Sequence, residues 1–139
     1  MEKLKALSVK VDKVKAIEVG DVYKSKMILD HVITGRDGVV QMNHGTVAPG
    51  VKLSGDLHEQ DEIYYILGGK GKLQLDDEII DVSKDQVIFI PAGVFHRLDN
   101  TESSEELTLL TLWKDYRYND MYAHRVKLWG KSFKTIDEE

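Results

Sequence analysis

The stretch GDLHEQDEIYYILGGKG, residues 55–71, joins charged side chains to a short apolar run and a glycine turn. Its middle part is rich in β-branched and aromatic residues, which favours a β-strand over residues 62–67. Because side chains alternate across a strand, Glu62 and Tyr64 are expected to share one face. A carboxylate on an otherwise apolar face needs a partner, since burying an unpaired charge is costly. With His58 four residues before Glu62, the partner is either a metal ion or a polar rim of unrelated residues.

The sequence on both sides of this stretch contains further short apolar runs, each closed by a turn signal of Gly, Pro or Asp. The pair Asp76–Asp77, for example, separates two such runs and is typical of a hairpin turn. Many short strands at this spacing are typical of an all-β sandwich or barrel. We therefore predict an all-β fold with strands at residues 24–33, 39–50, 62–67, 72–75, 78–82, 86–93, 97–100 and 107–113.

The two ends of the chain have different patterns from the predicted barrel core at residues 22–113. Residues 7–19 of the N-terminal extension (1–21) predict one more strand, either at a sheet edge or exchanged between subunits. In the C-terminal extension (114–139), apolar residues at helical spacing predict a helix within residues 116–129 that packs on the outside of the barrel; they are Tyr118, Tyr122, Val126 and Trp129. The simplest organisation is one domain spanning residues 1–139.

Composition and charge exclude several classes of protein. The 139 residues contain no cysteine, which excludes a disulfide scaffold and a cysteine-based zinc site. The net charge is -5 and the basic residues are scattered, so we expect no nucleic-acid partner. No apolar run approaches the ~20 residues that cross a bilayer, so no membrane partner is expected. The N-terminus has no apolar region of the kind found in secretory signals, which predicts a cytoplasmic protein.

Three of the five histidines lie outside both the opening stretch and the region of the Pro-x-Gly turn at residues 91–93. His31 and His124 have no partner at a recognisable spacing, and we expect ordinary exposed or hydrogen-bonded roles for both. His44 lies on a predicted strand in phase with Met42 and Thr46, and periodicity alone leaves open which face of that strand lies inside the barrel.

His58 and His96 have a different setting. His96 follows a Pro-x-Gly turn, which can direct a strand towards the interior. If both imidazoles lie on one concave wall with Glu62, they provide two histidines and one carboxylate, the ligands of a metal site with open coordination positions.

At this point the sequence resembles a known family, the cupins. The first cupin motif is Gly, five residues, His-x-His, three or four residues, Glu, six residues, Gly. The second is Gly, five residues, Pro-x-Gly, two residues, His, three residues, Asn. The spacings of both motifs fit residues 50–100, with Asp56 in place of the first histidine and Asp85 in place of the second motif's glycine. The matching positions are Gly50, Asp56, His58, Glu62 and Gly69, then Asp85, Pro91, Gly93, His96 and Asn100.

The resemblance implies a double-stranded β-helix, or jelly-roll barrel, followed by a short helical or irregular extension. It also implies that His58, Glu62 and His96 bind one divalent transition metal (Fe, Mn, Zn or Ni). Asp56 is then a fourth ligand through oxygen, or stands outside a three-ligand site. In a third alternative the metal is lost and Asp56 binds an organic ligand.

Cupins perform many reactions, so the resemblance does not specify one. It implies a metal-dependent enzyme that acts on a small polar metabolite in the barrel, a sugar derivative or an organic acid, by isomerase, lyase or dioxygenase chemistry. Tyr64 and then His44 are the candidates for moving a proton. The alternatives are a non-catalytic cupin module that binds a small ligand and, less favoured by the small size and charged surface, a storage protein. The resemblance further implies a homodimer.

Overall fold

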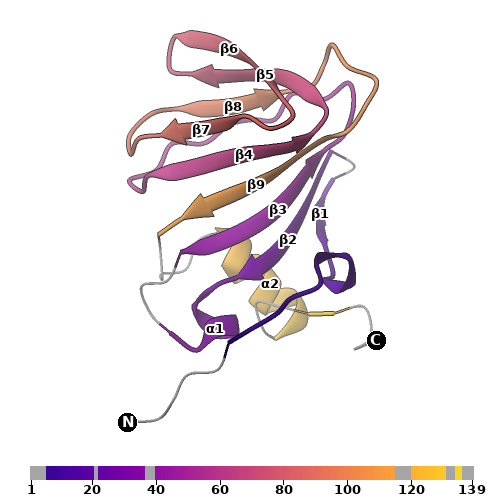
Figure 1. The fold of residues 1–139 in the computed structure, drawn as a ribbon, viewed down its shortest axis with the longest axis vertical. Helices are drawn as coiled ribbons and strands as arrows, with labels where there is room; N and C mark the ends of the chain where they lie inside the picture. The colour runs from indigo at the N-terminus through magenta and orange to yellow at the C-terminus, as the bar shows by residue number, and fades with distance from the viewer. Residues whose placement is uncertain (1–5, 21, 37–39, 115–119, 131–133, 136–139) are drawn as a thin grey trace.

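Two antiparallel β-sheets make up the upper and middle parts of the molecule (Figure 1). The computed structural model describes residues 6–20, 22–36, 40–114, 120–130 and 134–135. The elements in chain order are a 3-10 turn (Val11–Lys13), β1 (Ile17–Val19), β2 (Tyr23–Leu29), α1 (His31–Thr34), β3 (Gln41–Val47), β4 (Glu62–Gly68), β5 (Lys70–Leu75), β6 (Glu78–Ser83), β7 (Val87–Ile90), β8 (His96–Asp99), β9 (Leu107–Trp113) and α2 (Asp120–Trp129).

The strand order confirms the all-β jelly roll that the sequence predicts. One sheet has the order β1-β2-β3-β9-β4-β7, and the other has the order β6-β5-β8. The segment before β4 lies alongside β8, because Lys52 and Asp56 form bridges to Asp99 and His96. This segment therefore extends the smaller sheet, and its last residues reach the end of the barrel where β4 begins.

The barrel interior is apolar at one end and polar at the other. Side chains on the inner face of the larger sheet alternate with outer ones, as in β3, where every second residue from Gln41 to Val47 is buried. The apolar core includes Val47, Ile66, Leu107 and Leu109. Farther along the same inner face the buried side chains are polar; they include Ser25, Gln41, Asn43 and Thr111.

A glycine turn carries the chain from one sheet to the other. Gly69 lies between β4 in the larger sheet and β5 in the smaller one, with φ of +80°. A Cβ atom at this position would clash with the backbone carbonyl oxygen of Glu106. Only glycine adopts this positive φ without strain and has no Cβ atom to clash, which explains the glycine between β4 and β5 in the GGKG sequence.

The observed strands differ from the predicted ones by a few residues at most boundaries, and the largest differences lie at residues 24–33 and 7–19. The strand predicted at residues 24–33 ends at Leu29, because the Asp30 carboxylate accepts a hydrogen bond from the Ile33 N–H at 2.8 Å and starts α1. The strand predicted at residues 7–19 is largely a 3-10 turn and irregular chain. Its last part is β1, which pairs with β2 of the same chain at the sheet edge.

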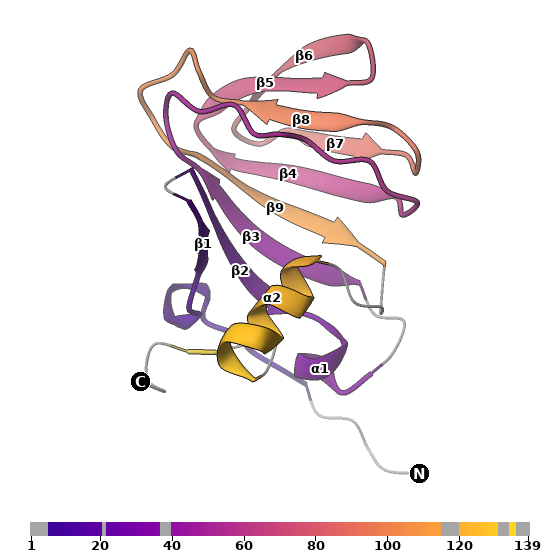
Figure 2. The same cartoon turned by 180° about the vertical axis from the view of Figure 1, so that it is seen from behind.

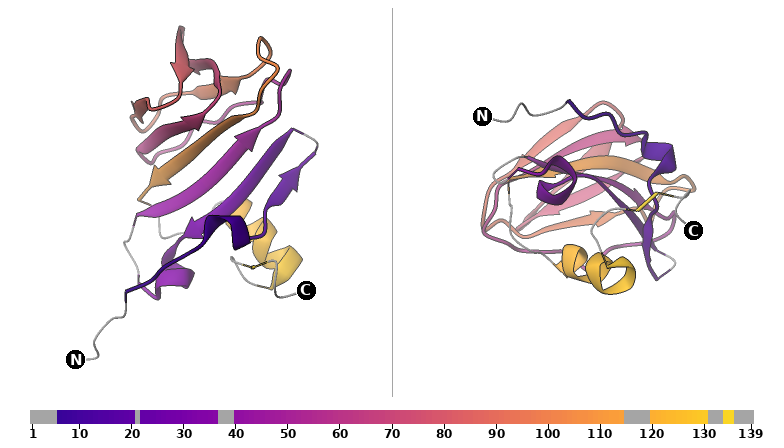
Figure 3. Two further views of the ribbon diagram at one scale, coloured as in Figure 1. Left: turned by 45° about the vertical axis from the view of Figure 1, so that its right-hand side comes forward. Right: turned by 90° about the horizontal axis from the view of Figure 1, so that it is seen from below.

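The C-terminal helix lies on a different side of the sheet from the one we predicted. In Figures 2 and 3, α2 lies across β2 and β3 below the smaller sheet. Arg125 of α2 is fully buried, and its charge acts on Tyr23, which lies on the inner face beside Asn43. The helix therefore lies on the inner side of β2 and β3, where Arg125 is fully buried.

Only part of the predicted helical face can be compared with the structure. Val126 and Trp129 are partly buried, while Tyr118 and the side chain of Tyr122 lie outside the described residues. No helix in the described part of the chain has the length and apolar character needed to span a membrane.

Candidate metal centre

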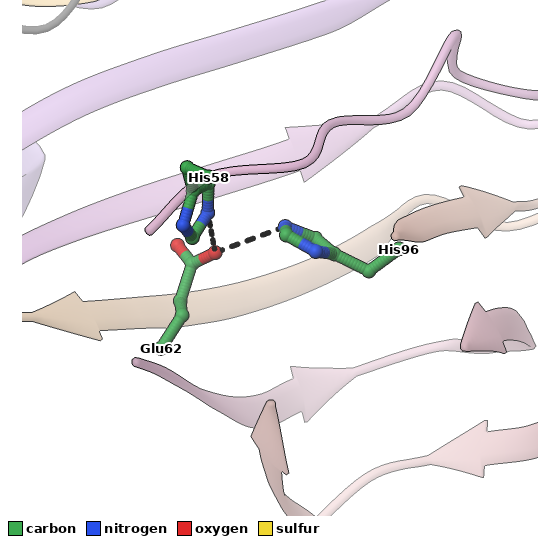
Figure 4. Close-up of side chains that lie close together, drawn as sticks. All are labelled: His58, Glu62 and His96. Carbon is green, nitrogen blue, oxygen red and sulfur yellow. Dashed lines mark hydrogen bonds and ion pairs between the residues drawn. The ribbon is translucent and has the colours of Figure 1, made fainter. Parts of the chain in front are cut away.

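Three chain segments bring two imidazoles and one carboxylate to the same end of the barrel. Glu62 is the first residue of β4, and His96 is the first residue of β8 in the facing sheet. His58 lies in the segment that leads into β4. Figure 4 shows the three side chains pointing towards one another across the space between the sheets.

The ligand atoms of these three residues are close together. Glu62 Oε1 lies 3.1 Å from His58 Nε2 and 3.2 Å from His96 Nε2. One ligand atom from each residue lies within 4.8 Å of the other two. The centroids of the two imidazole rings are 4.9 Å apart, and the ring planes make an angle of 76°. We call His58, Glu62 and His96 the triad.

Backbone carbonyls determine which ring nitrogens face Glu62. The Nδ1 of His58 is 3.0 Å from the Gln60 carbonyl oxygen, and the Nδ1 of His96 is 3.0 Å from the Val94 carbonyl oxygen. A carbonyl only accepts hydrogen bonds, so each Nδ1 carries a hydrogen. In the neutral rings each Nε2 atom then carries a lone pair, and this lone pair points at the Glu62 carboxylate oxygen. Three acceptors that converge in this way need a cation between them, either protons or a metal ion.

The donor set fits a divalent transition metal. Nitrogen and oxygen ligands lie about 2.1 Å from such an ion, which separates two ligands at a right angle by about 3.0 Å. The distances from Glu62 Oε1 to the two Nε2 atoms are close to this separation. Fixing imidazoles through Nδ1–H to carbonyl bonds is a common feature of metal sites. Three protein ligands would leave coordination positions for water or substrate.

Burial and charge alter the protonation of the residues in and beside the triad. Burial disfavours the charged form of His96, but the hydrogen bond to Glu62 and the Val94 carbonyl outweigh this effect and raise its pKa. Burial, with the charge of Glu62, raises the pKa of Tyr64 well above its ordinary value. The Tyr64 ring is edge-on to His96, with centroids 6.0 Å apart. Its phenol therefore remains protonated beside the triad.

Asp56 lies next to the triad without being part of it. Its backbone exchanges two hydrogen bonds with His96, at 2.9 and 3.0 Å. Residues paired in this way have side chains on the same face, and the charge of Asp56 contributes to the raised pKa of His96 and Tyr64. Its Oδ1 accepts a hydrogen bond from the Leu57 N–H at 2.8 Å. The residue is exposed, at the rim of the site.

The structure does not bring His44 to the triad. The neighbouring residues Asn43 and Gly45 are buried on the inner face of β3, so His44 projects from the opposite face. Burial, with the nearby charge of Lys26, lowers the pKa of His44. Of the remaining histidines, His31 is the first residue of α1, and the side chain of His124 lies outside the described residues.

Sequence reasoning missed several polar residues that the fold places on the inner face. Gln41 and Asn43 are buried in β3, and Arg125 is fully buried in α2. The alternation along β3 did divide the residues into two faces, because Gln41, Asn43 and Val47 alternate with Met42 and His44. Both sets mix polar and apolar residues, so the pattern could not tell the inner face from the outer one.

With the fold and the triad established, comparison with known proteins becomes informative. A family model described as the cupin domain matches residues 43–113, slightly more than half of the chain. The chain belongs to the cupin family. This confirms the resemblance carried by the two motifs, which lie within the matched range and include all three triad residues.

Individual cupin relatives show the fold rather than one activity. An uncharacterized protein of Streptomyces coelicolor is 32% identical over 56 residues, which cover 40% of this chain and 51% of the relative. An acireductone dioxygenase of Metarhizium robertsii is 40% identical over 53 residues, 34% of each chain. The chain spans about half the length, or less, of these curated relatives.

A solved structure extends the fold comparison over most of the chain. The crystal structure of a predicted oxalate decarboxylase from Thermotoga maritima matches with a TM-score of 0.69 at 18% identity. The match covers 78% of this cupin and 98% of that chain. At this identity the likeness shows the fold alone.

Proposed function

We propose that this cupin is a metal-dependent enzyme that acts on a small polar metabolite, a sugar derivative or an organic acid. The observation that supports the proposal is the triad, in which two lone pairs and a carboxylate oxygen converge at 3.1 and 3.2 Å. One divalent metal, Fe, Mn, Zn or Ni, would be held by His58, Glu62 and His96, with Asp56 as a fourth ligand after rotation of its side chain.

The residues around the triad suit isomerase, lyase or dioxygenase chemistry. When bound, the metal would polarise an oxygen of the substrate as a Lewis acid. Tyr64 keeps its proton because burial raises its pKa, so its phenol is suited to donating a hydrogen bond or a proton to a substrate oxygen. The similar proteins include a predicted oxalate decarboxylase and an acireductone dioxygenase. Both names refer to reactions of small organic molecules, which supports this substrate class.

The first test is elemental analysis of protein purified without an affinity tag or chelator. We expect about one equivalent of Fe, Mn, Ni or Zn in the wild type and strong loss of metal in His96→Ala. His44→Ala is the matched control, because it removes a partly buried histidine of the same barrel from the opposite face of β3. Equal metal content in all three proteins would refute the assignment of the triad.

Asp56→Asn tests the fourth ligand in the same assay. Replacing one carboxylate ligand with an amide should weaken metal binding about tenfold, measured by competition with a chelator. Unchanged affinity would place Asp56 outside the coordination sphere, while the triad would keep its role.

Turnover separates the enzyme from the alternative, a non-catalytic module that binds a small ligand. Iron in the protein would direct the assays to oxygen uptake with organic acids, and zinc or manganese to isomerase and lyase substrates. Tyr64→Phe should keep the metal and lower kcat about a hundredfold or more. A ligand that binds the loaded protein and is recovered unchanged would support the binding module instead.

We further propose a homodimer that acts in the cytoplasm. Val87, Phe89 and Ile63 expose 60%, 58% and 39% of their surface on the outer face of β4 and β7. Apolar side chains grouped at a sheet edge favour contact with a second copy of the chain.

A further inference from the structure

One buried amide group on the inner face of the barrel lacks a partner. Gln41, the first residue of β3, is 1% exposed. Among the residues that the structure describes, its amide nitrogen Nε2 has no hydrogen-bond partner. A buried donor without a partner is destabilising and uncommon in native proteins. Such a group is expected where a bound molecule supplies the missing acceptor.

The strand register places this amide in one row with the triad. Gln41 pairs with Trp113 of β9, and Trp113 pairs with Glu62 of β4. Residues directly opposite one another on neighbouring strands project from the same face of the sheet. All three residues stand at the end of their strands, where the barrel opens. Glu62 and Trp113 are only partly buried, so this end of the interior is accessible from solvent.

Other polar groups on the inner face of the same sheet satisfy one another. Ser25 Oγ donates a hydrogen bond to Asn43 Oδ1 at 2.6 Å, and Asn43 Nδ2 donates one to the Tyr23 hydroxyl at 3.4 Å. Asn43 is 5% exposed, so it is as enclosed as Gln41 and lies two residues farther along the same face. The contrast shows that the unpaired nitrogen of Gln41 is not a general feature of this polar interior.

The spacing of the row indicates the size of the missing molecule. Gln41 and Glu62 are two strands apart, which corresponds to about 10 Å. A hydrogen bond of about 2.9 Å at one end and a metal–oxygen bond of about 2.1 Å at the other leave about 5 Å between two ligand oxygens. With bonds of about 1.4–1.5 Å, an extended chain of about three or four carbon atoms with oxygen at both ends has this length.

We propose that Gln41 binds the far end of the substrate, with its Nε2 donating a hydrogen bond to a substrate oxygen while the near end lies at the triad. This identifies the substrate class as a polyoxygenated acid of at least about three or four carbons that lies across Trp113. The inference rests on the proposed metal site and adds a positioning residue to it.

The first test is the stability of the metal-free protein and needs no ligand. In Gln41→Met, an apolar side chain of similar size replaces the unpaired amide, so Tm should stay level or rise by up to about 3 °C. Asn43→Leu is the matched control: it removes two hydrogen bonds and should lower Tm by about 5 °C or more. A comparable fall in Gln41→Met would mean that the amide is satisfied inside the protein, for example by a buried water, and would overturn the proposal.

The second test compares two probes of different length on protein loaded with Mn(II), by titration calorimetry. Gluconate has six carbons and can reach Gln41 from the triad, whereas oxalate has two carbons and cannot. We expect Gln41→Met to weaken gluconate binding about tenfold and to leave oxalate binding unchanged, because one hydrogen bond is lost only with the longer probe. Equal gluconate affinity in variant and wild type, or no gluconate binding by the loaded wild type, would overturn the proposal.

The Mn(II) content of each protein is measured before the titration. A wild type that binds no metal would refute the proposed metal site. Full metal content with no effect of Gln41→Met on gluconate would refute only the role of Gln41.

Discussion

At the scale of single residues, two backbone carbonyls determine the chemistry of the site. The carbonyls of Gln60 and Val94 hold the Nδ1 hydrogens of His58 and His96, so both Nε2 atoms face Glu62 as acceptors. The imidazole of His44, on the outer face of the sheet, has a different environment. Burial, with the charge of Lys26, lowers the pKa of His44.

The lowered pKa of His44 predicts a specific dependence of stability on pH. In the unfolded chain His44 has its ordinary pKa of 6.5, so as pH falls the unfolded state takes up the proton first. The free energy of unfolding should therefore decrease as pH falls through about 6.5, until the folded state is protonated as well. His44→Gln should remove this part of the decrease.

Urea unfolding of the metal-free proteins at pH 7.5, 6.5 and 5.5 checks this expectation. The difference between wild type and His44→Gln isolates the histidine, because the other titrating groups are common to both. Identical slopes, or a wild type that gains stability relative to the variant at low pH, would contradict the assignment.

At the scale of elements, the two glycines that bound the first motif have different roles. Gly50 and Gly69 both have positive φ, +77° and +80°. A Cβ atom on Gly50 would meet no atom within 4 Å, whereas one on Gly69 would clash with the Glu106 carbonyl oxygen. Gly69 also links the two sheets, so a distortion of its backbone changes the relative orientation of β4 and β5.

This difference predicts unequal effects of the same substitution. Gly50→Ala should cost about 1–2 kcal/mol, the strain of a positive φ. Gly69→Ala adds a backbone clash and should cost about 3 kcal/mol or more. The midpoints and slopes of urea unfolding measure both values, and an equal loss in the two variants would show that the corner relaxes without cost.

At the scale of the whole molecule, the larger sheet leaves apolar side chains uncovered at its β7 edge. Phe89 pairs with Ile63 across β7 and β4, and both side chains are on the outer face. The triad lies on the inner face at this end of the sheet, where Glu62 of β4 pairs with Ile90 of β7. A second copy on the outer face would therefore cover apolar surface without blocking the site.

We predict that Phe89→Glu separates the proposed dimer. Size-exclusion chromatography with light scattering should give about twice the chain mass of 15.8 kDa for the wild type and the single mass for the variant. Ile79→Glu is the control, because Ile79 is 64% exposed in β6 of the other sheet and should leave the dimer intact. A wild type of single mass would refute the dimer.

The sequence by itself determined the class of fold, most strand positions and the residues of the triad. These features depend on local patterns: alternation within a strand, glycine where φ is positive, and the motif spacings between residues 50 and 100. The strand predicted at residues 24–33 ended early for an equally local reason, because the Asp30 side chain competes with the sheet for the next backbone N–H groups.

Only the tertiary structure decided which face of β3 lies inside, and therefore that Gln41 rather than His44 shares the interior with Glu62. It also placed Trp113 between Gln41 and Glu62, and α2 over the inner side of β2 and β3. These arrangements depend on hydrogen bonding between strands far apart in the chain and on the burial of Arg125. Such contacts leave no periodic trace in a segment whose two faces both mix polar and apolar residues.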